Sequence, residues 1–234
     1  MDRITRKELK RDKFALEVEH TVEYVAEHRK AVIRYSVIGA AVLIAILAFF
    51  AYRRQQHGVR QEALTAALEI QQAVVGPAPN EFIRAYPTEQ AKDEAASKAF
   101  ADMAAKYAGS EEGVIAEYYL GTNAADQGKV AEAEKWLKDV IDSGNANYGS
   151  LAKLTLAEVY KAQGKPGEGE SLLRSLMAKP TDFVSKEQAT IALADLIATS
   201  NPAEARKLLA PLLTERSAIS RVAVQKTGGL SSAR

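Results

Sequence analysis

The sequence contains no cysteine and only three histidines in 234 residues. The lack of Cys excludes a disulfide framework, a thiol nucleophile, a Cys-ligated zinc and a lipid-modified Cys anchor. No His follows His57, so a Ser–His catalytic pair cannot form in the remaining chain. The 31 basic and 30 acidic residues nearly cancel, which gives no basic surplus for nucleic acid. The Gly164-Lys165-Pro166 stretch lacks the pattern of a phosphate-binding loop. We therefore expect no enzyme, cofactor, metal site, small-molecule substrate or nucleic-acid partner.

One apolar run, from Tyr35 to Tyr52, has the features of a membrane span. Its 18 residues carry no charge, and a helix of this length covers about 27 Å, close to the roughly 30 Å hydrocarbon core. Tyrosines end the run and basic pairs flank it at 29–30 and 53–54, which is typical of membrane interfaces. A buried core helix fits this length and these flanks less well, and a cleaved signal peptide has a shorter leader. We predict an uncleaved transmembrane helix at 35–52.

The tail before this run carries nine basic and seven acidic residues. The basic residues close to the span are equally numerous on its two sides, but the short tail has the larger total. By the positive-inside rule the tail is predicted to be cytoplasmic, and the larger domain then lies across the membrane. Apolar residues recur in the tail at helical spacing, and Thr5 with Glu8 forms a capping box. Three roles are compatible with this amphipathic helix: contact with lipid headgroups, contact with a partner, or plain solvation.

The remaining chain is rich in Ala and Leu and repeats at an offset of 36 residues. Helical periodicity is broken near the start by the segment 76–79 and by Pro87. The aligned positions are Gly128, Gly164 and Ser200 at the turns, Ala133, Gly169 and Ala205 where helices would cross, and Leu137, Leu173 and Leu209 in the core. Each unit is predicted to be helix, tight turn, helix, with Gly as a left-handed cap and Pro202 in the first turn of its helix.

This pattern resembles tetratricopeptide repeats, whose units of about 34 residues carry small residues at the helix crossing and Gly in the turn. The first unit matches at Leu120-Gly121, Gly128 and Ala133, and the second at Leu156-Ala157, Tyr160 and Gly164. The resemblance implies an all-α fold, with a single N-terminal transmembrane helix followed by a tetratricopeptide-like α-solenoid. The expected divisions are a cytoplasmic tail (1–34), a transmembrane helix (35–52), a linker helix with a degenerate helix pair (53–110), repeats (111–215), and a C-terminal helix with a frayed end (216–234).

The whole layout resembles one group of proteins, the membrane-anchored tetratricopeptide proteins that are ancillary subunits of the Sec translocon. The matching stretches are Glu27-His28-Arg29-Lys30, Tyr86-Pro87, Lys106-Tyr107 and the run from Leu156 to Val159. The resemblance implies a single-pass protein of the bacterial inner membrane whose repeat domain lies in the periplasm. There it would contact translocon subunits and pass emerging chains to periplasmic chaperones.

A solenoid presents an extended concave surface, so the expected function is non-enzymatic protein binding by a membrane-anchored scaffold. The alternative is a cell-envelope or division-coordinating adaptor that binds envelope proteins independently of the translocon. If Leu120 and Leu156 point into the core, positions two residues away lie on another face of the same helices. The predicted partner-binding groove consists of Tyr118, Tyr119, Thr122, Leu154, Glu158 and Lys161.

Overall fold

The computed structural model describes residues 28–78, 80, 83–214, 222 and 225, and it divides into two compact units, 1–58 and 59–234. The predicted amphipathic helix of the tail and the frayed C-terminal end lie outside the described residues. Helix α2, Arg29–Gln71, begins in the first unit and ends in the second. The two units are considered separately below.

The apolar run lies within α2, which is 43 residues long. The sequence analysis divided this region into a transmembrane helix at 35–52 and a linker helix after residue 52, whereas the structure has one helix that ends at Gln71. No proline interrupts this stretch, and a Cβ added at Gly39 or Gly58 would meet no atom within 4 Å. The apolar side chains of the run are exposed, and the helix is long and apolar enough to cross a membrane.

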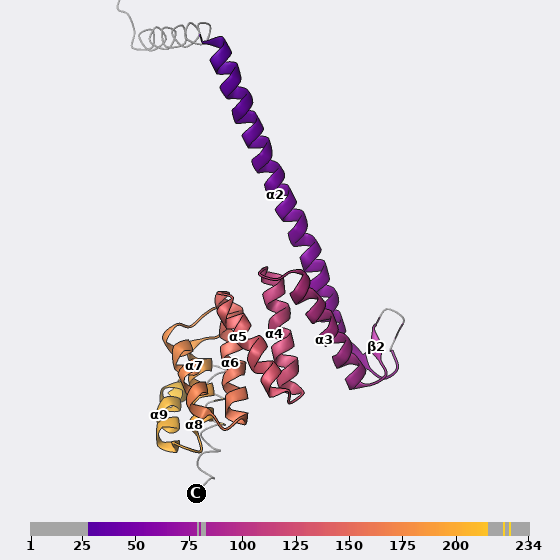
Figure 1. Cartoon of the computed structure of the whole chain (residues 1–234). Coiled ribbons are helices and arrows are strands. Elements are labelled where there is room, and N and C mark those ends of the chain that lie inside the picture. The colour runs from indigo at the N-terminus through magenta and orange to yellow at the C-terminus, as the bar shows by residue number, and fades with distance from the viewer. Residues whose placement is uncertain (1–27, 79, 81–82, 215–221, 223–224, 226–234) are drawn as a thin grey trace, which may run out of the picture. The chain divides into compact units, whose positions relative to one another are not determined.

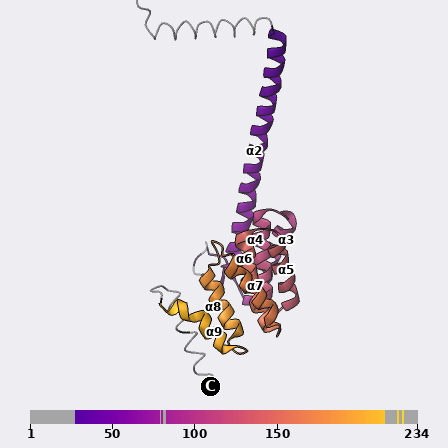
Figure 2. The ribbon, with the colours of Figure 1, turned by 90° about the vertical axis from the view of Figure 1, so that its left-hand side faces the viewer.

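The second unit is a succession of helices after α2 (Figure 1). They are α3 (Glu89–Lys106), α4 (Glu111–Asp126), α5 (Val130–Asp142), α6 (Ala146–Ala162), α7 (Pro166–Ala178), α8 (Lys186–Ile197), α9 (Pro202–Leu209) and the 3₁₀ helix η1 (Ala210–Thr214). Each helix packs against the next along the chain. Figure 2 shows α8 and α9 at one end of this stack and α3 at the other. The all-α fold predicted from the sequence is confirmed.

A small parallel pairing between α2 and α3 was not predicted. Strands β1 (Val74–Val75) and β2 (Ala85–Tyr86) pair there. Gly76 follows β1 with a φ of 103°, and its N–H donates to the carbonyl of Tyr86 at 2.9 Å. A positive φ strains residues with a Cβ, so Gly suits this position. Helix α2 therefore ends at Gln71, before the segment that the sequence marked as helix-breaking, and Gly76 closes a short strand pair.

The predicted turns are present, and several helices carry capping residues at their N-terminal or C-terminal ends. Gly128 and Gly164 have φ values of 71° and 72°, the left-handed conformation expected after α4 and α6. Pro202 occupies the first turn of α9, after the N-cap Asn201. Side-chain oxygens accept from backbone N–H groups at the starts of several helices, with the caps Thr88, Ser110, Asn145, Ser185 and Asn201.

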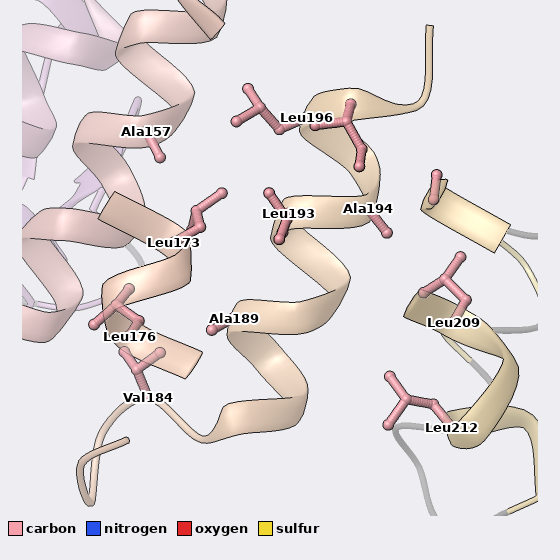
Figure 3. Packing of buried hydrophobic residues seen from close by; sticks show 12 residues of the cluster. Ala157, Leu173, Leu176, Val184, Ala189, Leu193, Ala194, Leu196, Leu209 and Leu212 are labelled. Carbon is pink, nitrogen blue, oxygen red and sulfur yellow. The ribbon is translucent and has the colours of Figure 1, made fainter. Parts of the chain in front are cut away.

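The core consists of three clusters of buried apolar side chains along the stack. Figure 3 shows the cluster nearest the C-terminal end, where Leu173 of α7 and Leu193 of α8 point toward each other and Leu209 of α9 lies on the opposite side of α8, beside Ala194. The small residues predicted at the helix crossings are buried: Ala133 and Ala205 are 0% exposed. A Cβ at Gly169 would lie 3.0 Å from the carbonyl oxygen of Ala157. Helix α7 thus approaches α6 at a distance that a larger residue would prevent.

The first helices of the repeat units form one layer. Helix α4 contacts α6 and α6 contacts α8, although a further helix separates the members of each pair in the sequence. The second helices α5 and α7 are not in comparable contact within the described residues. The helices are therefore more closely spaced on the α4–α6–α8 side than on the α5–α7 side.

Candidate protein-binding surface

A row of aromatic side chains crosses the α4–α6 layer. Its members are Phe100, Tyr119, Tyr118, Tyr148 and Phe183, in spatial order. Consecutive ring centroids are 4.9, 5.7, 5.6 and 5.4 Å apart, and all but the stacked first pair meet edge to face. These separations lie in the favourable range for aromatic pairs. The aromatic row therefore runs from the core at α3, where Phe100 is 0% exposed, through α4 and α6 to the α7–α8 loop.

The two adjacent tyrosines of α4 point in different directions because successive helical residues are about 100° apart. Tyr119 stacks on the buried Phe100 of α3 and packs against the core cluster that contains Phe100 and Leu120. Tyr118 turns toward α6, where its ring meets that of Tyr148, and packs against the core cluster that contains Leu137 and Leu156. Both tyrosines are half-buried. The two adjacent tyrosines of α4 thus connect the buried Phe100 of α3 to Tyr148 of α6.

Phe183 ends the row and is 44% exposed. The α7–α8 loop holds it there through its neighbours: Val184 is 0% exposed, the Thr181 N–H donates to the Val184 carbonyl at 3.0 Å, and the Val184 N–H donates to Thr181 Oγ1 at 3.2 Å. The Thr181 hydroxyl also hydrogen-bonds to that of Ser150 on α6 at 2.7 Å. A large apolar side chain is therefore presented to solvent by a loop that hydrogen bonds and a buried neighbour hold in place.

The structure places the predicted groove residues in different settings. Tyr118 and Tyr119 lie in the aromatic row. Thr122 is half-buried, and its hydroxyl donates to the Tyr119 carbonyl at 3.1 Å. Leu154 packs against the core cluster of α7 and α8, so it contributes to the core as well as to the surface.

The two charged members of the predicted groove, both on α6, are exposed. Lys161 Nζ lies 2.7 Å from the Asp195 carboxylate of α8, which ties two layer helices together. Glu158 is one of the charged groups acting on the Tyr118 phenol. Lys161 is thus already paired within the chain, while Glu158 faces the row.

Sequence reasoning missed Tyr148 and Phe183, which complete the row. Neither residue occupies a position at which an aromatic residue recurs with the 36-residue period. The residues 36 positions before and after Tyr148 are Glu112 and Val184. The one available signal was an aromatic residue in the otherwise polar Thr181-Asp182-Phe183 loop. An apolar side chain in a loop is a candidate contact residue when the backbone conformation of the loop does not depend on it.

Two tyrosines of the row, Tyr118 and Tyr148, remain neutral at physiological pH. Burial raises the pKa of Tyr118 and Tyr148 above the usual value, and nearby carboxylates act in the same direction. For Tyr118 a hydrogen bond with Thr155 acts the opposite way. Neutral phenols offer apolar contact area together with a hydroxyl donor, a combination that is enriched at protein interfaces.

A hollow lies at the C-terminal end of the stack, apart from the aromatic row. It is an open groove of about 800 Å³, whose apolar lining includes Met177, Leu208 and Leu212. Lysines and glutamates border it, including Lys186 and Glu204. Within the described part of the chain, no group of three or more His, Asp or Glu side chains could hold a metal ion.

The succession of helix pairs, each packed against the next, defines a helical-repeat protein. The family described as tetratricopeptide repeat-like domain matches residues 27–210, and the chain belongs to that family. No curated protein and no solved structure matched the chain in the corresponding searches. Domains of this family are typically non-catalytic, which accords with the expectation of a binding protein.

Proposed function

We propose that this protein is a membrane-anchored scaffold whose repeat domain binds polypeptide partners along the aromatic row. The exposed Phe183, fixed beside Tyr148 by an anchored loop, is the observation that carries the proposal. Folding stability does not require an exposed Phe at this position, whereas an apolar side chain from a partner would cover it. The apolar run of α2 supplies the anchor.

The finer proposal is an ancillary subunit of the bacterial Sec translocon, with the repeat domain in the periplasm beside translocon subunits and chaperones. Support comes from the order of parts: a short charged tail, one apolar helix and a tetratricopeptide-like domain. In this arrangement the anchor keeps the aromatic row close to chains that leave the channel. Tethering raises the effective concentration of the row at the membrane, so weak contacts suffice.

The test is capture by the full chain after mild detergent extraction and membrane crosslinking. We expect translocon subunits to co-purify, and Phe183→Ala to reduce their capture at equal expression and equal helicity. Ile83→Ala is the matched control, because Ile83 is a 40% exposed apolar residue in the loop between β1 and β2. Recovery of envelope-synthesis or division proteins in place of translocon subunits would favour the adaptor function. Equal capture by the Phe183 variant and the unaltered chain would remove the row from the binding surface.

A further inference from the structure

The aromatic row is bordered by carboxylates. Glu111 begins α4, Asp126 ends α4, and Glu158 lies in the last two turns of α6. All three side chains are exposed, and none forms an ion pair with another described residue. Glu111 lies two helical turns before Tyr118 on the same face of α4, and Glu158 lies one turn after Thr155, which hydrogen-bonds to the Tyr118 phenol. The carboxylates of Glu158 and Asp126 help to raise the pKa of Tyr118, and that of Glu111 helps to raise the pKa of Tyr148. The exposed parts of the two tyrosines therefore lie in a negative potential.

Basic side chains do not cancel this potential at the row. Lys161 is one helical turn beyond Glu158, but its ammonium lies 2.7 Å from the Asp195 carboxylate. The charges of Lys161 and Asp195 therefore cancel, and the pair adds no net charge between α6 and α8. A partner of opposite charge would thus be attracted along the length of the row.

We infer that the aromatic row selects polypeptide segments in which Lys or Arg side chains alternate with apolar ones, and that it rejects acidic segments. This inference rests on the proposed function, because it names the chemistry of the partner at the same surface. Apolar side chains would cover Tyr148 and Phe183, while the cationic ones reach the carboxylates of Glu111, Asp126 and Glu158. Cations also bind favourably over aromatic faces. An acidic segment would place like charges together, which disfavours binding.

Three fluorescent peptides test the inference with the full chain in phosphatidylcholine nanodiscs. The peptides share alternating Leu residues and carry Lys, Glu or Gln at the remaining positions, and empty nanodiscs correct for lipid binding. Anisotropy titrations give each Kd. We expect the Lys peptide to bind about tenfold more tightly than the Glu peptide at low salt, the effect of several exposed charge pairs acting together. Added salt should reduce this preference.

The decisive variant is the triple substitution Glu111→Gln, Asp126→Asn, Glu158→Gln. It should reduce the preference to less than about threefold and leave binding of the Gln peptide unchanged. The matched control is Glu132→Gln, Asp142→Asn, Glu168→Gln, which removes three exposed acids from α5 and α7 and should keep the full preference. Equal Kd values for the Lys and Glu peptides, or a preference that survives the first triple substitution, would overturn the inference.

The same titrations separate this inference from the proposed function. If Phe183→Ala weakens binding of the Gln peptide but charge has no influence, the row binds polypeptides and only the charge selection is wrong. If Phe183→Ala changes binding of no peptide, or if no peptide binds, the row is not the binding surface and both proposals fail.

Discussion

Gly121 shows how a single residue sets the spacing of a helix pair. A Cβ at this position would lie 2.8 Å from Cδ2 and Cγ of Leu137, which is itself 0% exposed. Leu137 has no free space to move into, so α4 and α5 would have to separate. We expect Gly121→Ala to lower the free energy of unfolding by about 1–3 kcal/mol. The measurement is chemical unfolding of the full chain in mild detergent, followed by fluorescence of Trp136.

Trp136 is the only Trp in the sequence and packs against the cluster shared by α3 and α4, so its signal reports on the repeat domain. Gly167→Ala is the control, since a Cβ there would meet no atom within 4 Å in the first turn of α7. That variant should be neutral or slightly stabilising. Equal stability of the two variants would contradict the close packing at Gly121.

Glu134 gives the repeat domain an acid-sensitive contact. Hydrogen bonds from Lys138 and Gln163 lower the pKa of Glu134 to about 2, and the Tyr160 hydroxyl donates to the same carboxylate at 3.3 Å. A pKa lower in the folded than in the unfolded state stabilises the fold above the unfolded pKa. This stabilisation is lost as the pH falls from about 4.5 to about 2.

The corresponding variant is Glu134→Gln, which removes the charge and keeps the side-chain length. We expect it to be less stable than the unaltered chain near pH 6, with a deficit that shrinks below pH 4. Urea midpoints at several pH values measure this. Glu132→Gln serves as the comparison because Glu132 is exposed on the same helix. A deficit independent of pH would show that the contact does not depend on the charge of Glu134.

At the scale of elements, the last turn of α2 is joined to α4 by a pair of side-chain amides. Gln71 Nε2 donates to Asn123 Oδ1 at 3.1 Å, and Asn123 Nδ2 donates to Gln71 Oε1 at 2.9 Å. Asn123 is buried, so removal of one partner leaves a polar group without its hydrogen bonds. We expect Asn123→Leu to cost about 1–3 kcal/mol of unfolding free energy, whereas adding Gln71→Leu should recover part of this loss. Unfolding of the two single variants and the double variant completes the cycle.

Strict additivity of the two losses would contradict the amide pair. The comparison is Gln90→Leu on α3, because Gln90 donates to the exposed Glu94 at 2.9 Å and its loss should matter little. A second contact joins the same helices: Arg60 Nε of α2 lies 3.0 Å from a carboxylate oxygen of the buried Glu112 on α4. The C-terminal part of α2 therefore belongs to the repeat domain as well as continuing the apolar helix.

The sequence predicted those elements whose causes are local. A Gly in the left-handed conformation ends α4, and Pro202 begins α9, because these residues act on their own backbone. The residues that contact Tyr118 could not be predicted from local sequence. Tyr148 reaches it from the next repeat and Phe183 continues the row from a loop after α7. Neither contact follows the 36-residue period, so only the folded arrangement brings these aromatic side chains together.

The orientation of the whole molecule depends on charges at both ends of the apolar run. The tail carries nine basic residues, but three lie close to the run on each side: Arg29, Lys30 and Arg34 before it, and Arg53, Arg54 and Arg60 after it. Short cytoplasmic segments carry the excess of basic residues, whereas long domains cross largely regardless of charge. We therefore expect a reporter fused after Arg234 to be active only in a periplasmic format.

The balance of nearby charges makes this prediction sensitive to substitution. Replacing Arg29, Lys30 and Arg34 with Gln should lower the fraction of molecules whose C-terminus is periplasmic, because the tail loses its basic residues nearest the membrane. Replacing Arg53 and Arg54 with Gln should leave that fraction unchanged or raise it, and it spares Arg60, which contacts Glu112. Paired reporters that are active only in the periplasm or only in the cytoplasm measure both fractions. Cytoplasmic activity of the unaltered fusion would place the aromatic row on the other side of the membrane, where it could not meet exported chains.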